Sequence, residues 1–142
     1  MGFKFNPLTA RFDLVGAGGT STPITQSSTL GIVVDNGTDA LTTGLKGYYT
    51  APYTCTINKW RLTGDTSGSI VFDIWKKANA IPTVTDTIIT SGTKPSLSSS
   101  KITSSDNLTG WITSVTSGDV LAYNVDSSST IRQIVLILEV TK

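Results

Sequence analysis

Residues 130–140, Thr-Ile-Arg-Gln-Ile-Val-Leu-Ile-Leu-Glu-Val, form the longest apolar run of the chain, and we expect the fold to be organised around them. The run contains no Gly or Pro and is rich in β-branched residues and Leu, which indicates a β-strand. Side chains alternate across a strand, so the run has two faces. One face is wholly apolar and consists of Ile134, Leu136, Leu138 and Val140. The other face is apolar at its centre and consists of Ile131, Gln133, Val135, Ile137 and Glu139.

A strand that is apolar on both faces lies inside a domain or at a contact between subunits, because a face turned to water is normally polar. The sequence therefore predicts Ile131, Val135 and Ile137 as a possible subunit interface.

The rest of the chain also has the composition of a β-protein. Ser and Thr make up about 29% of its 142 residues, good helix formers are scarce, and no window shows an apolar period of 3.6 residues. About eight short strands, with turn signals every 8–12 residues, indicate an all-β, jelly-roll-like sandwich. The expected strands are residues 30–35, 42–50, 53–63, 69–76, 87–90, 108–112, 120–125 and 130–140. Asn36-Gly37 is a hairpin signal, residues 64–68 read as a turn, and residues 91–101 read as a polar loop.

The first 29 residues differ from the remainder. Three Phe residues lie in the first 12 positions without an evident partner segment, and a Gly/Ser/Thr linker follows at residues 16–23. We expect residues 1–29 to be an extended arm with its linker, and residues 30–142 to be the sandwich domain. The arm either packs on its own domain or docks on another protein, and the flexible linker favours docking. The candidate anchoring residues are Phe3, Phe5, Pro7, Leu8, Phe12 and Leu14.

Charge gives little indication of a charged partner. The net charge is +1 and only 15% of residues are charged, so neither a nucleic acid nor a membrane surface is expected as partner. The longest apolar run is too short to span a bilayer, and residues 1–14 lack the apolar core of a secretory signal. The single cysteine, Cys55, excludes a disulfide between two cysteines of one chain and is expected to be a small core residue.

Catalytic chemistry has few candidates in this sequence. The chain contains no His, which excludes Ser-His-Asp and Cys-His arrangements, and most Asp residues lie at turns that explain them. Asp35, Asn36 and Asp39 offer too few ligands for calcium. We therefore expect no enzyme activity, no metal and no cofactor. A polysaccharide hydrolase would need two facing carboxylates, and the two strand-borne acids are Asp73 and Glu139.

Aromatic residues provide a separate alternative. Tyr48, Tyr49 and Trp111 could form a platform for a glycan, whereas aromatic filling of a core or interface is the simpler interpretation of the chain's aromatic residues.

Several segments resemble tailed-bacteriophage virion proteins. The opening Phe-Lys-Phe-Asn-Pro-Leu-Thr at residues 3–9, with Phe-Asp-Leu-Val at 12–15, is similar to a short N-terminal segment of such proteins. The body resembles a small β-domain of phage structural proteins. The matching runs are Gly-Leu-Lys-Gly-Tyr at 44–48, Ala-Pro-Tyr-Thr-Cys-Thr-Ile-Asn-Lys-Trp at 51–60, Gly-Ser-Ile-Val-Phe-Asp-Ile-Trp-Lys at 68–76, Lys-Pro-Ser-Leu at 94–97, Leu-Thr-Gly-Trp at 108–111 and Gly-Asp at 118–119.

The resemblance implies a jelly-roll-like sandwich, often a homotrimer, with an arm that fixes it to a neighbour, and it brings no catalytic motif. The leading hypothesis is a capsid decoration (cement) protein whose arm binds the major capsid protein or another virion protein. Its location would be the virion, assembled in the host cytoplasm. The alternative is a tail-fibre or baseplate component that recognises a host-surface glycan.

Overall fold

A computed structural model describes the backbone of residues 2–6, 11–15 and 24–142, and the side chains of residues 24–142. The protein is all-β, and its one described helical turn is a 3-10 turn, η1 (Val84–Asp86). The strands are β1 (Gly2–Asn6), β2 (Arg11–Val15), β3 (Ser27–Asp35), β4 (Gly44–Thr50), β5 (Cys55–Ala78), β6 (Ser96–Ser105), β7 (Ser114–Val115), β8 (Asp119–Ser129) and β9 (Gln133–Thr141).

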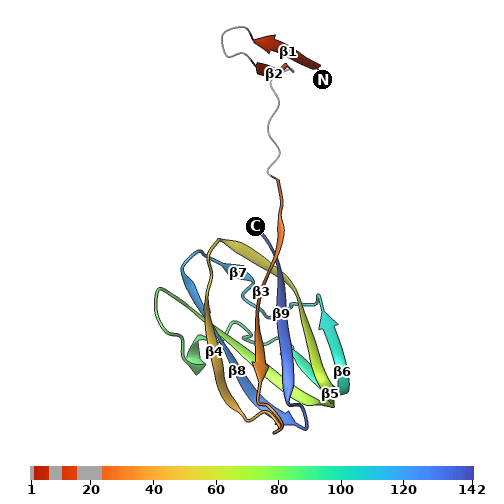
Figure 1. Cartoon of the computed structure of the whole chain (residues 1–142). Helices are drawn as coiled ribbons and strands as arrows, with labels where there is room; N and C mark the ends of the chain where they lie inside the picture. The colour runs from red at the N-terminus through yellow and green to blue at the C-terminus, as the bar shows by residue number, and fades with distance from the viewer. Residues whose placement is uncertain (1, 7–10, 16–23) are drawn as a thin grey trace.

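Seven of these strands form one curled antiparallel sheet, shown in Figure 1, and its main path runs β3-β9-β5-β8-β4. β6 and β7 pair with β5 off this path. The curl comes from β5, whose residues 56–64 pair with β9 and whose residues 69–78 pair with β8. The first half of β5 therefore belongs to a β3-β9 layer and the second half to a β8-β4 layer. This arrangement confirms the expected all-β, sandwich-like fold.

The continuity of β5 corrects one expectation, because residues 64–68 do not reverse the chain. They belong to a single strand of 24 residues, which bends there while it changes partner from β9 to β8. Gly68 is needed at the bend, since a Cβ atom there would collide with Thr130 Oγ1 and with the carbonyl oxygen of Ser129. Turn composition thus marks a change of layer here rather than a hairpin.

The apolar run that begins at residue 130 becomes β9, which starts only at Gln133. Thr130 has φ 67, in the left-handed region, and this breaks the strand before Gln133. The expected apolar face of β9 is confirmed, because Ile134, Leu136 and Leu138 have no exposed surface and Val140 has 1%. β9 lies between β3 and β5 and is therefore an internal strand.

The other strand predictions have mixed outcomes. The strand expected at residues 53–63 corresponds to the first part of β5, which has a register shift between Ile57 and Lys59. The Asn36-Gly37 hairpin is wrong, because β3 pairs with β9 and the following strand, β4, pairs with β8. The loop at residues 91–101 is also wrong in its second half, where β6 begins. Residues 87–90 and 108–112 form isolated bridges only, Trp75 to Thr87 and Ile89 to Trp111.

The boundary of the sandwich also lies earlier than expected, since β3 begins at Ser27 rather than at residue 30. Gln26 and Lys142 exchange both backbone hydrogen bonds just beyond the end of the ladder, at 2.9 and 2.8 Å. The chain therefore enters and leaves the sheet at one end.

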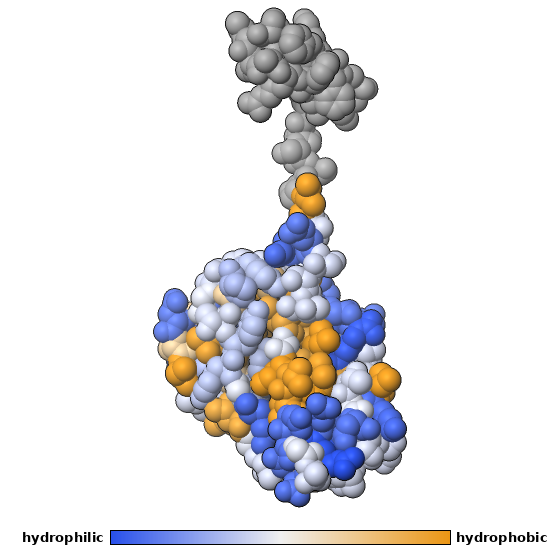
Figure 2. Space-filling view, viewed as in Figure 1, coloured by the Kyte–Doolittle hydropathy of each residue, from blue (hydrophilic) through white to orange (hydrophobic). Residues whose placement is uncertain are grey.

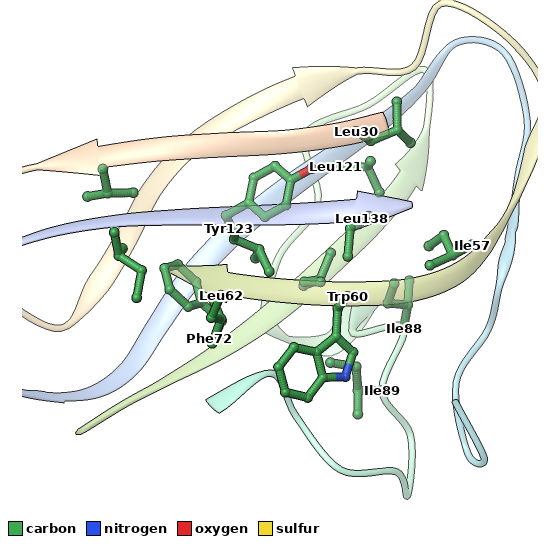
Figure 3. Close-up of a cluster of buried hydrophobic side chains, with 14 of the residues drawn as sticks. Leu30, Ile57, Trp60, Leu62, Phe72, Ile88, Ile89, Leu121, Tyr123 and Leu138 are labelled. Carbon is green, nitrogen blue, oxygen red and sulfur yellow. The ribbon is translucent and has the colours of Figure 1, made fainter. Parts of the chain in front are cut away.

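The core lies between the two layers, where side chains from β3, β5, β8 and β9 converge (Figure 3). Phe72, Leu62 and Tyr123 have no exposed surface, and Cys55 is buried as expected. The hydroxyl of Tyr123 and the indole N–H of Trp60 are buried without a protein partner among the described residues. Burial raises the pKa of Tyr123 far above its usual range, so the phenol stays neutral.

Candidate functional site

The most exposed apolar surface of the sheet lies on the outer face of the β3-β9 layer. Strand register places Val33 opposite Val135, Val135 opposite Thr63, and Thr63 opposite Ile102, so these residues form one row across four strands. Val33 is 63% exposed and Ile102 is 70% exposed, while Val135 is half-buried. Ile137 lies two positions along β9 from Val135 and is also half-buried. We call Val33, Val135, Ile137 and Ile102 the apolar strip.

A shallow hollow of ≈ 340 Å³ is lined by residues from both faces of β3 and β9, among them Leu30, Gly31 and Ile137, and by Tyr49 of β4. Gly31 is opposite Ile137 and gives the outer face a position without a side chain. A Cβ atom at Gly31 would collide with the carbonyl oxygen of Leu136, so the approach of β3 to β9 requires glycine. The outer face thus carries a projecting Val33 and, two residues away, a position without a side chain.

Charged residues lie beyond the strip at both ends. One end holds Lys59 and Glu139, and Glu139 Oε1 lies 2.6 Å from Nε of Arg61, which is opposite Ile137. The other end holds Asp35, Arg132 and Asp65, and the Asp65 carboxylate accepts hydrogen bonds from Gln133 N and Arg132 N at 3.1 Å each. Those backbone donors, with the Arg132 guanidinium, hold the pKa of Asp65 below its usual value. Figure 2 shows the apolar area over β3 and β9 with polar surface below it.

Two of the three predicted interface residues, Val135 and Ile137, lie on this face. Ile131 does not, and its assignment to the interface is corrected, because it precedes β9 and has no exposed surface. The broken strand at Thr130 removes Ile131 from the alternation on which the prediction depended. Sequence reasoning missed Val33 because its strand partner was unknown, and it missed Ile102 because no strand was expected between the polar loop at residues 91–101 and residue 108.

The arm forms a separate two-stranded sheet in which β1 pairs with β2, a partner that the sequence reading did not recognise. Phe3 is opposite Leu14, and Phe5 is opposite Phe12. Opposed residues of an antiparallel pair share a face, and so do residues two apart on one strand, so these four positions lie on one face. Lys4 is opposite Asp13 on the other face. The predicted anchors Pro7 and Leu8 lie outside the described residues.

The three residues of the glycan alternative do not come together, which corrects that expectation. Tyr48 is 48% exposed, whereas its neighbour Tyr49 is on the opposite face of β4 and packs against the core. Trp111 is 9% exposed, and its indole N–H donates to the carbonyl oxygen of Thr93 at 3.1 Å. Strand alternation separates the two tyrosines, and burial removes the tryptophan.

The two strand-borne acids are also held apart, in different layers. Asp73, on the second half of β5, is buried and accepts hydrogen bonds from Ile74 N, Trp75 Nε1, Thr87 Oγ1 and Lys94 Nζ. Lys94 also binds Asp126 at 2.6 Å, and its pKa is raised by the hydrogen bond to Asp126 and then by Asp73. Glu139 is on β9 and pairs with Arg61. The facing pair of carboxylates that a glycosidase needs is therefore not assembled from these two residues.

The Asp35-Asn36-Asp39 segment uses its polar groups in the turn itself. Asp35 Oδ1 accepts from Gly37 N at 2.8 Å, and Asn36 Nδ2 donates to the carbonyl oxygen of Ala40 at 2.9 Å. Within the part of the chain that the structure describes, no group of three or more acidic, Cys or His residues could hold a metal ion. Among the same residues, no helix has the length and apolarity needed to cross a bilayer.

Comparisons with protein-family models, curated proteins and solved structures gave no match to this chain. The candidate sites therefore stand on their own geometry, which is a bare apolar strip on the β3-β9 layer and a hairpin arm with four apolar positions on one face.

Proposed function

We propose that the protein is a structural component of a tailed-bacteriophage particle, a capsid decoration protein that binds the assembled shell through its N-terminal arm. The register of the arm carries this proposal. Phe3 and Phe5 on β1 share a face with Phe12 and Leu14 on β2. A lone two-stranded hairpin is marginally stable in water, and leaving a large apolar side chain exposed costs about 1.5–3 kcal/mol relative to burying it. An arm of this kind is stabilised by a protein surface that covers its apolar face.

The mechanism is binding linked to assembly. A site that exists only between subunits of the finished shell stabilises that shell by mass action when the arm occupies it. Several arms on one oligomer raise the effective concentration of each, so the attachment strengthens with the number of copies. The resemblance to phage domains supports a homotrimer and a virion location, and the major capsid protein or another virion protein is the proposed partner.

The test uses paired substitutions on the two faces of the hairpin. Phe5→Ser with Phe12→Ser removes one opposed apolar pair, and Lys4→Ser with Asp13→Ser is the matched control on the other face. Shells of the encoding phage, stripped of the protein, are sedimented with each variant. We expect the first variant to lose at least about 90% of its binding, which is a tenfold change or 1.4 kcal/mol, and the control to bind like the unchanged chain.

Equal binding by both variants would refute the role of the apolar face. Electron microscopy of labelled particles gives the location independently. Label on the head shell supports decoration, whereas label confined to the tail would replace the capsid protein by a tail partner.

A further inference from the structure

We propose that the outer face of the β3-β9 layer is a two-fold contact between two copies of this chain, stacked with their strands antiparallel. The contact is centred between two cross-strand rows. One row contains Val33, Val135, Thr63 and Ile102, and the neighbouring row contains Gly31, Ile137, Arg61 and Ser104. This inference does not depend on the arm or on a phage particle.

The shape of the face fits itself in this orientation. A two-fold axis that runs across the strands, between the two rows, places each row of one copy over the other row of its partner. Val33, which is 63% exposed, then faces Gly31, a position without a side chain, in both halves of the contact. Val135 faces Ile137 in the same way. The Val33 side chain of each copy thus meets Gly31 of the other copy, so the same contact is made twice, as an isologous interface requires.

The charges fit the same orientation. At one end of the face, Lys59, Arg61 and Glu139 sum to one positive charge, and at the other end Asp35, Asp65 and Arg132 sum to one negative charge. Antiparallel stacking places the positive end of each copy over the negative end of its partner. Stacking with the strands parallel would bring like ends together, which opposes association.

The shape and the charge distribution of this face therefore both favour a second copy of the chain as its partner. Sheets stack face to face with their strand directions within about 30° of alignment, at a separation of about 10 Å. β3 is an edge strand that pairs with β9, and the 63% exposure of Val33 shows that the outer face is open at that position. Binding of the arm to a shell is compatible with the contact, because the arm and this face are made of different residues.

The first experiment measures the mass of the full chain by sedimentation. We expect reversible association of the chain through this face, with a dissociation constant that rises at least tenfold with Val33→Asp, because the new carboxylate would be buried without a partner. Ile81→Asp is the matched control, since Ile81 is 58% exposed but follows the second half of β5, away from this face. An unchanged chain that stays monomeric at about 1 mM, or a Val33→Asp variant that associates like the control, would overturn the proposal.

The second experiment tests the orientation by cross-linking full-length chains through a short bis-maleimide. Glu139 and Gln133 are six positions apart on β9, about 20 Å at 3.3 Å per residue. The proposed axis places Glu139 of one copy over Gln133 of the other, about 10 Å away. A mixture of Glu139→Cys and Gln133→Cys should therefore cross-link several-fold more than either variant alone. Equal or stronger cross-linking by one variant alone would contradict the antiparallel orientation.

Discussion

The outer faces of the two layers differ in how far the rest of the chain covers them. On the β8-β4 layer, Asp73 is only 4% exposed, and four hydrogen-bond donors from three segments of the chain surround it. On the β3-β9 layer, Val33 projects into solvent, and Glu139, at one end of the same face, pairs with an exposed arginine. One face is completed by the chain's own loop at residues 87–95, and the other is left apolar and bare.

This difference shows which outer face is covered by the chain's own residues and which is not. A buried carboxylate with all its partners supplied locally fixes the edge of one layer, because each donor would lose a bond if that edge moved. A bare apolar strip gains stability only when another surface covers it. The polar network around Asp73 thus stabilises the monomer, whereas the apolar strip is a surface for contact with another molecule. Three measurements test this contrast.

The largest effect is expected from a comparison within β9 itself. Leu136→Ala removes a fully buried side chain and should lower the free energy of unfolding by about 2–5 kcal/mol. Ile137→Ala, the next residue, removes a half-buried side chain and should cost less than about 1.5 kcal/mol. Urea unfolding at low protein concentration measures both. Similar losses would show that the outer face is part of the monomer's core.

The next comparison is between the two acids. Asp73→Ala leaves the Trp75 indole and the Thr87 hydroxyl without their acceptor and should cost about 1–3 kcal/mol. The pair with Lys94 adds little, because that lysine is one-third exposed. Glu139→Ala removes an exposed ion pair and should cost at most about 1 kcal/mol. Thermal unfolding orders the two variants, and an equal change in Tm would contradict the contrast.

The smallest effect is expected at the acidic end of the bare face. The pKa of Asp65 lies below its ordinary value of 3.8, so the folded state binds fewer protons there than the unfolded state. The resulting stabilisation is full above that ordinary value and is lost as pH falls through the lowered pKa. Asp65→Asn should therefore weaken the acid dependence of unfolding. Asp39→Asn, at an exposed turn position, is the control and should leave it nearly unchanged.

The sequence predicted the inner faces well because burial imposes a strict alternation. Ile134, Leu136 and Leu138 were expected on one face and are all fully buried. It predicted connections poorly, since Asn36-Gly37 forms a turn between strands that pair elsewhere, and the turn composition at residues 64–68 belongs to a continuous strand. Local propensity describes the bend of the backbone but not which distant strand will pair with it.

The candidate sites were predictable only in part, for the same reason. Val135 and Ile137 followed from alternation within one strand, whereas the row that includes Val33 and Ile102 exists only once four strands are in register. Gly31 gave no signal in the sequence, because its role depends on the approach of β3 to β9. A site formed by strands that are far apart in the sequence therefore cannot be predicted from the residue pattern of one sequence alone.

The exchange of hydrogen bonds between Gln26 and Lys142 has a mechanical consequence. The arm joins β3 at Ser27, so tension on an anchored arm pulls β3 lengthwise against β9. The nine residue pairs of that ladder would then be loaded in shear, all together, rather than opened one after another. An arm attached in this way would transmit force to the β3-β9 ladder, and the hydrogen bonds of that ladder would have to break together before β3 detaches.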